Sequence, residues 1–542
     1  MRVRAVLRSV AAAAGAPPDG RHQERIRIPL IATLLTGVAV GLLFDAATLG
    51  LRHLTGAPSF PENVSDLVVP YIPADTFGRL LSDLGPHGKE ILVVGSLLGA
   101  GLAVVGLAAV YGALVSRDWR PLRLGVTLWL LATLALWILL GPVLDANDAG
   151  GTLLERRVIG ILSLATCVAV ATSAAALMFA VLSRSSATAV SSTALTPARG
   201  SLSRRSLLAS VAGVSGGLVL GGGGLGAALQ SFRGATNLDY EGHGLAVEAL
   251  TPITATKDHY VVSKNLVDPS VDAARWRLEV KGLVASPVTL TLGELAGLTQ
   301  HEEIVTLECI ANGAGGTLMS TARWAGPRLA DVVARAGAIH PAARFAVVSA
   351  VDGYYDSLTH DEAMARSTLV ALRMNGQPLP DRHGYPARLV VPGRYGEKAM
   401  KWLTAIELSR NDYTGFYQRE GWSEAGVVRT FSRINAPTPG SRLPVGTQVA
   451  VTGLAFAGTR GVSRVELSDD GGTTWGQAEL EAEISPYAWR FWRWRWTPGV
   501  AGRHTLTVRA VDGTGAVQTK DDYGITPAGA SAWHSVSVFA VL

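Results

Sequence analysis

Cysteine and charged residues are scarce in this chain. Only two of its 542 residues are cysteines, Cys167 and Cys309, and charged residues account for 17% of the sequence, against roughly 25% in an average soluble protein. Because Cys309 is the only cysteine outside the apolar first part of the chain, the remainder cannot form an internal disulfide. The net charge of +5 is small for this length and gives no reason to expect nucleic-acid binding.

The shortage of charge is concentrated in the first 232 residues. Five apolar runs there are each long enough to cross a bilayer, which takes about 20 residues. We therefore predict a cytoplasmic tail over residues 1–27 and a transmembrane region of five helices over residues 28–232. None of the runs contains a histidine, which argues against a haem held between helices by two histidines. The five runs are Leu30–Leu49, Ile91–Val115, Leu124–Leu144, Ile159–Leu182 and Leu207–Leu229.

The loops between these runs predict the orientation in the membrane. Arginines concentrate in the N-terminal tail, in the loop Ser116–Arg123 and in the loop after the fourth run, whereas the intervening loops are more acidic. Because Lys and Arg mark cytoplasmic loops, the N-terminus is expected inside. An odd number of spans then puts residues 234–542 outside, in a multi-pass protein of the cell membrane.

A pair of arginines stands where the two halves join. The segment Ser203–Leu208 reads SRRSLL and precedes the glycine-rich fifth run, so it resembles a twin-arginine export signal. That route carries proteins already folded, as expected when a cofactor must be inserted first. The alternative is that these arginines simply flank a helix on its cytoplasmic side.

Residues 233–430 mix short strands with short helices. Ile304–Leu307 and Phe345–Ala350 predict strands, and Leu329–Ala336 predicts a helix. Without regular strand–helix–strand spacing, this pattern favours an α+β fold over a doubly wound parallel sheet. The region has neither a dinucleotide-binding glycine fingerprint nor a phosphate loop in a strand–turn–helix setting, which argues against nicotinamide and ATP chemistry.

Residues 431–542 are predicted to be all β. Alternating runs such as Gln448–Leu454, separated by turn signals, are typical of an immunoglobulin-like sandwich. The run Trp489–Trp496 alternates tryptophan with arginine, as a surface that stacks on bases would. Period-two spacing instead predicts a strand with Trp492, Trp494 and Trp496 on its packed face. We therefore expect this region to be structural.

Cys309 ends a strand-like stretch and precedes a glycine-rich turn, in the segment TLECIANG. A thiolate is a soft ligand that suits a metal. The alternative is a small buried hydrophobe, which is the usual role of a free cysteine. Spacing and composition alone leave both interpretations open.

Four segments of the soluble half form a specific pattern when their order and spacing are considered together. They are Asp258–Asn265 (DHYVVSKN), Leu307–Asn312 (LECIAN), Arg323–Leu329 (RWAGPRL) and Met374–Arg388 (MNGQPLPDRHGYPAR), which continues to Lys401–Leu403. In this order and spacing the chain resembles the sulfite oxidase-type molybdopterin oxidoreductases. The C-terminal β region resembles the dimerisation domain of that family.

The resemblance implies a molybdenum–molybdopterin cofactor, with Cys309 as the protein ligand of the metal beside the sulfurs of the pterin dithiolene. Glycines next to Cys309 would let a bulky cofactor approach the backbone closely. Arg388 and Lys401 offer the cations that a phosphate-bearing cofactor needs, although each residue alone could be an ordinary surface charge. The residues that the resemblance places around the pterin and its phosphate are Tyr260, Ser263, Lys264, Asp352, His383, Arg388 and Lys401.

The sequence departs from the sulfite-oxidising members where those members bind substrate. They use arginines around the metal, one in the segment that here reads Val261–Ser263 and another five residues after the cysteine, where this chain has Ala314. Trp422 aligns with their tyrosine beside the metal and is our second predicted catalytic residue. Losing two cations should weaken the binding of sulfite, since charge-assisted bonds contribute about 1.5–3 kcal/mol each. The cations that could substitute in space are Arg323, Arg394, Lys398 and Arg419.

The sequence therefore predicts a membrane-anchored molybdenum oxidoreductase that exchanges an oxygen atom with a small substrate outside the cytoplasm. No haem or iron–sulfur ligand set is visible in the sequence, so electrons would pass to or from a separate cytochrome or quinone-linked partner. The dimerisation-type region makes a homodimer a candidate state. Two alternatives remain: a non-catalytic binding or assembly protein that keeps the fold, and a true sulfite oxidase.

Overall fold

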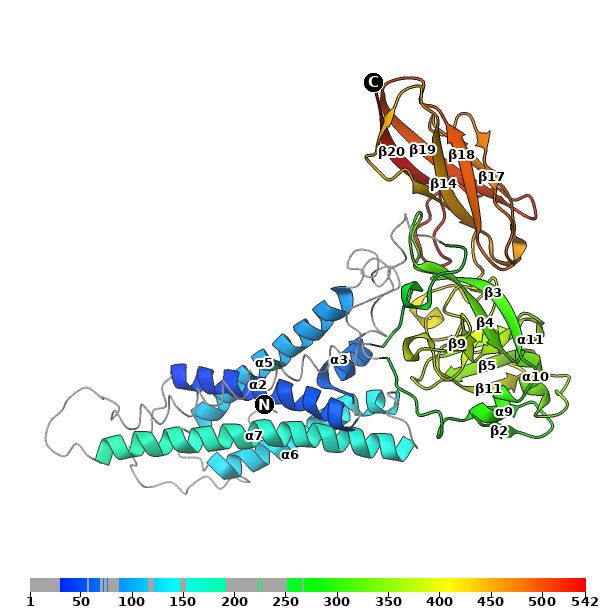
Figure 1. The fold of residues 1–542 in the computed structure, drawn as a ribbon. Coiled ribbons are helices and arrows are strands. Elements are labelled where there is room, and N and C mark those ends of the chain that lie inside the picture. The colour runs from blue at the N-terminus through cyan, green and yellow to red at the C-terminus, as the bar shows by residue number, and fades with distance from the viewer. Residues whose placement is uncertain are drawn as a thin grey trace. The chain divides into compact units, whose positions relative to one another are not determined.

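The computed structural model describes residues 30–55, 58–68, 87–115, 121–146, 153–191, 251–265 and 268–542, with a few isolated positions between them. The N-terminal tail, the twin-arginine segment and the fifth apolar run lie outside these residues, apart from two isolated positions of that run. The chain divides into a helical unit and a mostly β unit, which Figure 1 colours in blue to cyan and in green to red.

The helical unit is built from long apolar helices. They are α2 (Leu30–Thr55), the short α3 (Phe60–Val68), α5 (His87–Val115), α6 (Pro121–Ala146) and α7 (Leu153–Ser191). The packing of these helices uses small residues: a Cβ on Gly41 would lie only 3.3 Å from the Cα of Gly101. Such close approach is typical of helices that associate in a membrane.

Three of the five predicted spans are long and apolar enough to cross a membrane, namely Ile31–Arg52, Ile91–Val115 and Val158–Ala180. The prediction of five spans is thus corrected within the described part of the chain. The run at Leu124–Leu144 does lie in a helix, α6, but its apolar stretch among the described residues covers only Arg123–Leu136. That is shorter than the roughly 20 residues a span requires.

The first part of the β unit contains three sheets. A mixed sheet has the order β2 (Val288–Leu290), β1 (Leu278–Gly282), β11 (Leu403–Ser409), β5 (Phe345–Ala350) and β6 (Tyr355–Thr359), with β1 parallel to β11 and the other pairs antiparallel. An antiparallel sheet has the order β3 (His301–Glu308), β4 (Met319–Gly326), β8 (Arg373–Met374) and β9 (Gln377–Pro378), and β10 (Arg388–Val390) pairs with β7 (Leu369–Ala371). This mixture agrees with the predicted α+β class.

The helices of this region are short and locally specified. They are α9 (Leu292–Ala296), α10 (Leu329–Ala334), α11 (His360–Met364) and the single turns η2 (Thr256–Asp258), η3 (Asp381–His383) and η4 (Gln418–Glu420). Thr291 with Glu294 and Thr359 with Glu362 form capping boxes that fix the starts of α9 and α11. Each box satisfies backbone N–H groups that would otherwise lack a partner.

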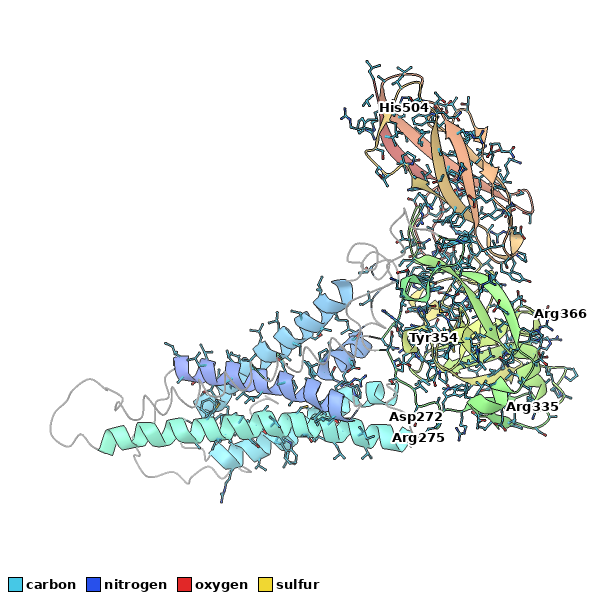
Figure 2. All side chains as sticks on the ribbon, in the orientation of Figure 1. Asp272, Arg275, Arg335, Tyr354, Arg366 and His504 are labelled. Atoms are coloured by element: carbon cyan, nitrogen blue, oxygen red, sulfur yellow. The ribbon has the colours of Figure 1, made fainter. Side chains whose placement is uncertain are left out.

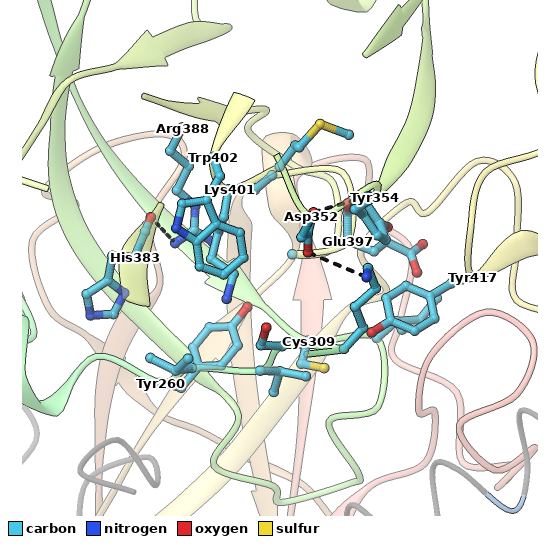
Figure 3. Close-up of a pocket in the computed structure, with 18 of the residues that line it drawn as sticks. Tyr260, Cys309, Asp352, Tyr354, His383, Arg388, Glu397, Lys401, Trp402 and Tyr417 are labelled. Carbon is cyan, nitrogen blue, oxygen red and sulfur yellow. Dashed lines mark hydrogen bonds and ion pairs between the residues drawn. The ribbon is translucent and has the colours of Figure 1, made fainter. Parts of the chain in front are cut away.

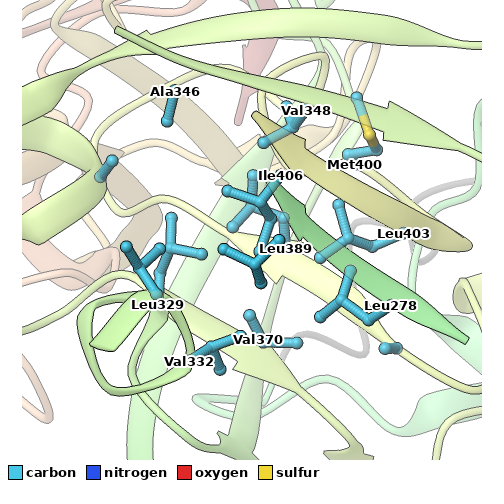
Figure 4. Packing of buried hydrophobic residues seen from close by; sticks show 14 of the residues in the cluster. Leu278, Leu329, Val332, Ala346, Val348, Val370, Leu389, Met400, Leu403 and Ile406 are labelled. Carbon is cyan, nitrogen blue, oxygen red and sulfur yellow. The ribbon is translucent and has the colours of Figure 1, made fainter. Parts of the chain in front are cut away.

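The core of this region fills the space between the mixed sheet and α10. Leu278, Val348 and Ile406 come from three neighbouring strands, and Leu329 and Val332 come from the helix; none of these side chains is exposed, as Figure 4 shows. Truncating such residues to Ala typically costs about 2–5 kcal/mol. Charged residues instead project from the rim, as Arg335 and Arg366 do in Figure 2.

The C-terminal region consists of two sheets that share one core. One has the order β12 (Phe431–Ala436), β14 (Val449–Phe456), β18 (Arg490–Trp496) and β17 (Glu479–Leu480). The other has the order β13 (Arg442–Pro444), β20 (His534–Val541), β19 (Gly502–Asp512), β15 (Val462–Ser468) and β16 (Gly476–Gln477), and the turn η5 covers Gly458–Arg460. The immunoglobulin-like topology remains a prediction.

The tryptophan–arginine run forms β18, as the alternation predicts. Trp492 and Trp496 are buried in the core and Trp494 packs against it, whereas Arg493 and Arg495 are exposed. The strand therefore contributes to packing, and Trp492 and Trp496 are unavailable for stacking on bases.

Candidate active site

A cavity of about 100 Å³ lies in the first part of the β unit (Figure 3). It is lined by segments far apart in the sequence, within residues 260–264, 309–311, 352–354, 382–388, 396–402 and 417–422. All the residues that the sequence assigned to the site line this one cavity: Tyr260, Ser263, Lys264, Cys309, Asp352, His383, Arg388, Lys401 and Trp422. Tertiary structure thus brings every predicted site residue together.

Cys309 is the first residue after β3. Its backbone N–H donates to the Leu318 carbonyl at 2.9 Å, and its own carbonyl accepts from the Asn312 N–H at 2.9 Å, so the start of the turn is fixed. Burial raises the pKa of the Cys309 thiol to about 12, and the nearby carboxyls of Glu397 and Glu308 add to this shift. A hydrogen bond from the Ala311 backbone opposes it. A metal would have to displace this proton, because the thiolate is the form that binds metals.

Cationic groups occupy one side of the cavity. Arg388 begins β10, donates from Nη1 to the His383 carbonyl at 3.2 Å and lies 5.0 Å over the ring of Trp324. Burial lowers its pKa to about 10, which leaves it charged at neutral pH. Lys401 lies 4.3 Å over the ring of Trp402. In Figure 3 His383, Arg388 and Lys401 lie on one side of Cys309, Glu397 and Tyr417 lie on the other, and Asp352 lies between the two groups.

Two buried polar atoms on the cationic side lack a protein partner in the described structure, namely Nε of Arg388 and Nδ1 of His383. Arg388 Nε is a donor, whereas His383 Nδ1 is an acceptor, because the other ring nitrogen, Nε2, donates to the Thr256 carbonyl at 3.2 Å. Burial, with the neighbouring His259, Arg388 and Lys401, lowers the pKa of His383 to about 2, so the ring is neutral. Unsatisfied buried polar atoms of this kind are costly. A bound group with both acceptor and donor atoms would satisfy Arg388 Nε and His383 Nδ1.

Gly396 forms a narrow part of the cavity wall. A Cβ at this position would lie 2.4 Å from Oη of Tyr260, and its N–H donates to the Glu308 carbonyl at 2.7 Å. Only a residue without a side chain allows the Tyr260 hydroxyl to approach the backbone this closely. Gly396 therefore fixes the position of Tyr260 in the cavity wall.

The opposite side of the cavity is acidic and aromatic. Lys264 pairs with Asp352 at 3.8 Å, and Asp352 also accepts the Tyr354 N–H at 3.1 Å. Burial raises the pKa of Glu397 to about 8, helped by the nearby Asp356 carboxyl and opposed by Lys398. Tyr417 lines the same side, and burial raises its pKa well above the usual range.

Several lining residues were not predicted from the sequence. They are Tyr354, Arg382, Glu397, Trp402 and Tyr417. Tyr417 stands in the same segment as Trp422, and Glu397 and Trp402 flank Lys401, so proximity to the recognised motifs was the available signal. Ala314, in contrast, is exposed and does not line the cavity.

The four cations that could have replaced the missing arginines are engaged elsewhere. Arg323 pairs with Glu302 at 3.2 Å, Arg394 pairs with Glu362, and Lys398 pairs with Asp356 at 2.6 Å. The guanidinium of Arg419 lies 5.0 Å over the ring of Tyr355. None of the four is among the residues that line the cavity in the described part of the chain.

Comparison with known proteins identifies the class. Residues 265–417 match the family described as "Oxidoreductase molybdopterin binding domain", and residues 427–540 match "Mo-co oxidoreductase dimerisation domain". The chain is 31% identical to the sulfite oxidase of Gallus gallus, covering 54% of this chain and 73% of that protein. It is 32% identical to the mitochondrial sulfite oxidase of Rattus norvegicus over 54% of this chain, and it spans 61% of that relative's length.

Two further similarities are more partial. A nitrate reductase [NAD(P)H] of Hordeum vulgare is 32% identical over 48% of this chain and 36% of its own length. The solved structure of the sulfane dehydrogenase SoxCD from Paracoccus pantotrophus is similar with a TM-score of 0.48 and 22% identity, over 55% of this chain and 85% of that one. The chain belongs to the sulfite oxidase-type family of molybdopterin-dependent oxidoreductases.

The cavity fits the molybdenum–molybdopterin cofactor that this family implies. It combines one thiol at Cys309 with two buried polar atoms that lack protein partners, the donor Nε of Arg388 and the acceptor Nδ1 of His383. Among the described residues no group of three or more His, Cys, Asp or Glu side chains could hold a metal ion. A single thiol suits a metal whose other ligands are carried by its own cofactor.

Proposed function

We propose that this protein is a membrane-anchored molybdenum oxidoreductase that exchanges an oxygen atom with a small, uncharged substrate outside the cytoplasm. The observation that carries the proposal is the position of the Cys309 thiol, inside a cavity with cationic donors on one side and acidic and aromatic groups on the other. A binding protein without catalysis would have no use for a metal ligand in that position.

In this proposal Cys309 holds the molybdenum, and Arg388, His383 and Lys401 hold the pterin and its phosphate. Arg388 and Lys401 supply charge, while the neutral His383 ring supplies a hydrogen bond. Tyr260, Ser263, Lys264 and Asp352 complete the wall. When bound, the cofactor supplies two-electron redox chemistry with transfer of an oxygen atom at the metal.

The proposed substrate is uncharged because the substrate side of the cavity offers little to an anion. Val262 occupies the segment where sulfite-oxidising members carry an arginine, and it lines the cavity. Lys264 on that side already pairs with Asp352, and Glu397 adds a carboxyl. A sulfoxide or an N-oxide would avoid the cost of bringing an anion next to these groups. Trp422 and Tyr417 would then shape the space beside the metal.

Oxidation of sulfite is the second candidate. It is favoured by the similarity to the rat and chicken sulfite oxidases, of which the chain spans 61% and 73%. It requires that Lys264 be released from Asp352 or that cations outside the cavity move. The two candidates therefore differ in the charge of the substrate.

Membrane anchoring is supported by the three long apolar helices. The alternating basic and acidic loops support an extracytoplasmic β unit, reached by twin-arginine export through residues 203–208. Electrons would pass to or from a separate cytochrome or quinone-linked partner, and the match to a dimerisation domain supports a homodimer. A reporter fused to the C-terminus tests the orientation, and reporter activity in the cytoplasm would overturn it.

The central experiment measures molybdenum and pterin in the full-length protein purified from a molybdenum-replete host, beside Cys309→Ser. We expect about one molybdenum per chain in the wild type, and a metal with altered ligation or none in the variant. A wild-type protein without molybdenum would reject the enzyme proposal. Dimethyl sulfoxide, trimethylamine N-oxide and sulfite, tested with artificial electron carriers, then separate the substrates. Turnover of sulfite at low micromolar concentration would favour the second candidate.

A further inference from the structure

The turn between β3 and β4 carries Cys309, and it is held from within by one side chain. Asn312 donates from Nδ2 to Oε1 of Glu308 at 2.9 Å, and its Oδ1 accepts the Leu318 N–H at 2.9 Å. These bonds tie the two ends of the turn to each other. The middle of the turn, around Gly315 and Gly316, is held by the C-terminal region instead.

Arg433 of β12 makes the first of these external contacts. Its guanidinium donates from Nη1 to the Gly316 carbonyl at 2.5 Å and from Nε to Oδ1 of Asn435 at 2.9 Å. The side chain is only 2% exposed. Burying an arginine this deeply is costly unless its donors are satisfied. The bond to Gly316 links β12 to the turn, and the bond to Asn435 holds the guanidinium in place.

His534, the first residue of β20, makes the second contact. Gly315 has a φ of +73°, and a Cβ there would lie 2.2 Å from Cδ2 of the His534 ring. The ring is itself held in place, because its Nδ1 accepts the Ile434 N–H at 3.1 Å. The turn therefore lies flat against a side chain whose orientation is fixed by the neighbouring β12.

The strand that leads to Cys309 is also joined to the C-terminal region. Thr306 donates its N–H to the Tyr487 carbonyl at 3.0 Å, and its Oγ1 accepts the Trp489 N–H at 2.9 Å. Contacts from the C-terminal region thus precede and follow Cys309 in the chain. Simple packing of two domains would not require the charged Arg433 side chain to donate to the Gly316 carbonyl, in the turn that carries Cys309.

We propose that Arg433 and His534 are positioning residues for Cys309, so that the C-terminal region is part of the metal site as well as a surface for association. Arg433 fixes the carbonyl side of the turn, and the ring of His534 sets how closely the turn can approach. This inference rests on the proposed role of Cys309 as the molybdenum ligand. A displacement of the turn would move the sulfur relative to the metal.

The test uses the full-length, cofactor-loaded protein and the Mo(V) electron paramagnetic resonance spectrum after partial reduction with dithionite. Arg433→Lys keeps the charge but lacks the planar guanidinium that reaches both Gly316 and Asn435. We expect molybdenum to be retained, the g values to shift, and kcat for dimethyl sulfoxide with reduced methyl viologen to fall about tenfold with KM within about twofold. The matched control is Arg503→Lys, an exposed arginine of β19 that contacts only Ser537 among the bonds described.

A second set of variants tests the same inference even if Arg433→Lys does not fold. Gly315→Ala should shift the same spectrum because the new methyl group meets the His534 ring. His534→Ala removes that ring, so the double variant should have the spectrum of His534→Ala alone, a non-additive result that identifies contact. Molybdenum-loaded Arg433→Lys and Gly315→Ala with wild-type spectra would overturn the inference. A wild type without molybdenum would instead overturn the proposed function.

Discussion

Lys398 and Asp356 form a buried ion pair beside the cavity, with 2.6 Å between Nζ and Oδ1. Lys398 also donates to the Ser357 carbonyl at 3.1 Å, and Gln418 donates to the other oxygen of Asp356 at 3.4 Å. The sequence alone left Lys398 available as a replacement for a missing substrate-binding arginine. The structure shows instead that the charge of Lys398 is neutralised by Asp356.

Breaking this pair should destabilise the protein. Removing one partner of a buried pair costs about 3–5 kcal/mol, because the other charge stays buried without compensation. We expect Lys398→Met to lower the unfolding midpoint of the full chain in detergent strongly, and Lys398→Met with Asp356→Leu to recover much of the loss. The exposed pair of Arg323 with Glu302 is the control, since Arg323→Met should change the midpoint little. Equal effects of the single and double variants at residues 356 and 398 would contradict the assignment.

An arginine at residue 262 should restore recognition of an anion. Val262 lines the cavity, so Val262→Arg would put a guanidinium where the chain has none. One charge-assisted bond contributes about 1.5–3 kcal/mol, which corresponds to roughly 10- to 100-fold in kcat/KM for sulfite. Val262→Gln provides similar polarity without charge and should give much less. Sulfite turnover that is efficient in the wild type and unchanged in Val262→Arg would show that anion binding does not depend on this wall.

Stability of the β unit should fall on mild acidification because of His259. This histidine has no exposed surface, and burial, with the nearby Arg388 charge, lowers its pKa to about 3. The unfolded chain binds a proton near pH 6.5 while the folded chain does not, so stability is lost as pH falls from 6.5 towards 3. Between pH 6.5 and 5 the loss is about 2 kcal/mol for one group.

The measurement compares chemical unfolding of wild type and His259→Leu at pH 7 and pH 5. The variant lacks the titrating ring, so its stability should decrease less on acidification by about 2 kcal/mol. His340, which is exposed, provides the matched control in His340→Leu. An identical pH dependence of wild type and His259→Leu would show that folding does not lower the pKa of this ring.

The two tryptophan positions of β18 should differ in their contribution to the C-terminal core. Trp492 is 1% exposed and belongs to that core, whereas Trp494 only packs against it. Trp492→Ala is expected to cost about 3–5 kcal/mol, and Trp494→Ala clearly less. Hydrogen exchange of the β14 and β19 amides would report both effects. A larger cost at Trp494 would contradict the assigned face of the strand.

Much of the fold could be predicted from periodicity. Alternation identified β18 and placed Trp492 and Trp496 on the packed face, because successive side chains of a strand point to opposite sides. Short helices such as α10 were predicted nearly to their ends. The number of membrane spans could not be predicted in this way. Apolar composition predicted a span over Leu124–Leu144, whereas the apolar stretch of α6 among the described residues covers only Arg123–Leu136.

The set of cavity residues could also be predicted, but only through the family motifs. Cys309 by itself was open to two interpretations, and the motif segments led to Arg388 and Lys401 as its neighbours. Glu397 and Tyr354 were missed although they stand near Lys401 and Asp352 in the sequence, because no local pattern shows which neighbours of a motif residue also face the cavity. The roles of all these residues remain predictions until the cofactor is measured.

The sequence by itself determined the family, the single thiol and the absence of an arginine at residue 262, because these depend only on residue identity and order. Tertiary structure decided which charged side chains form internal ion pairs and which residues hold the Cys309 turn in place. Lys398 lies beside Asp356, and Arg433 reaches Gly316, across separations of 42 and 117 residues. No local pattern encodes such contacts, since they exist only when distant strands pack into one core.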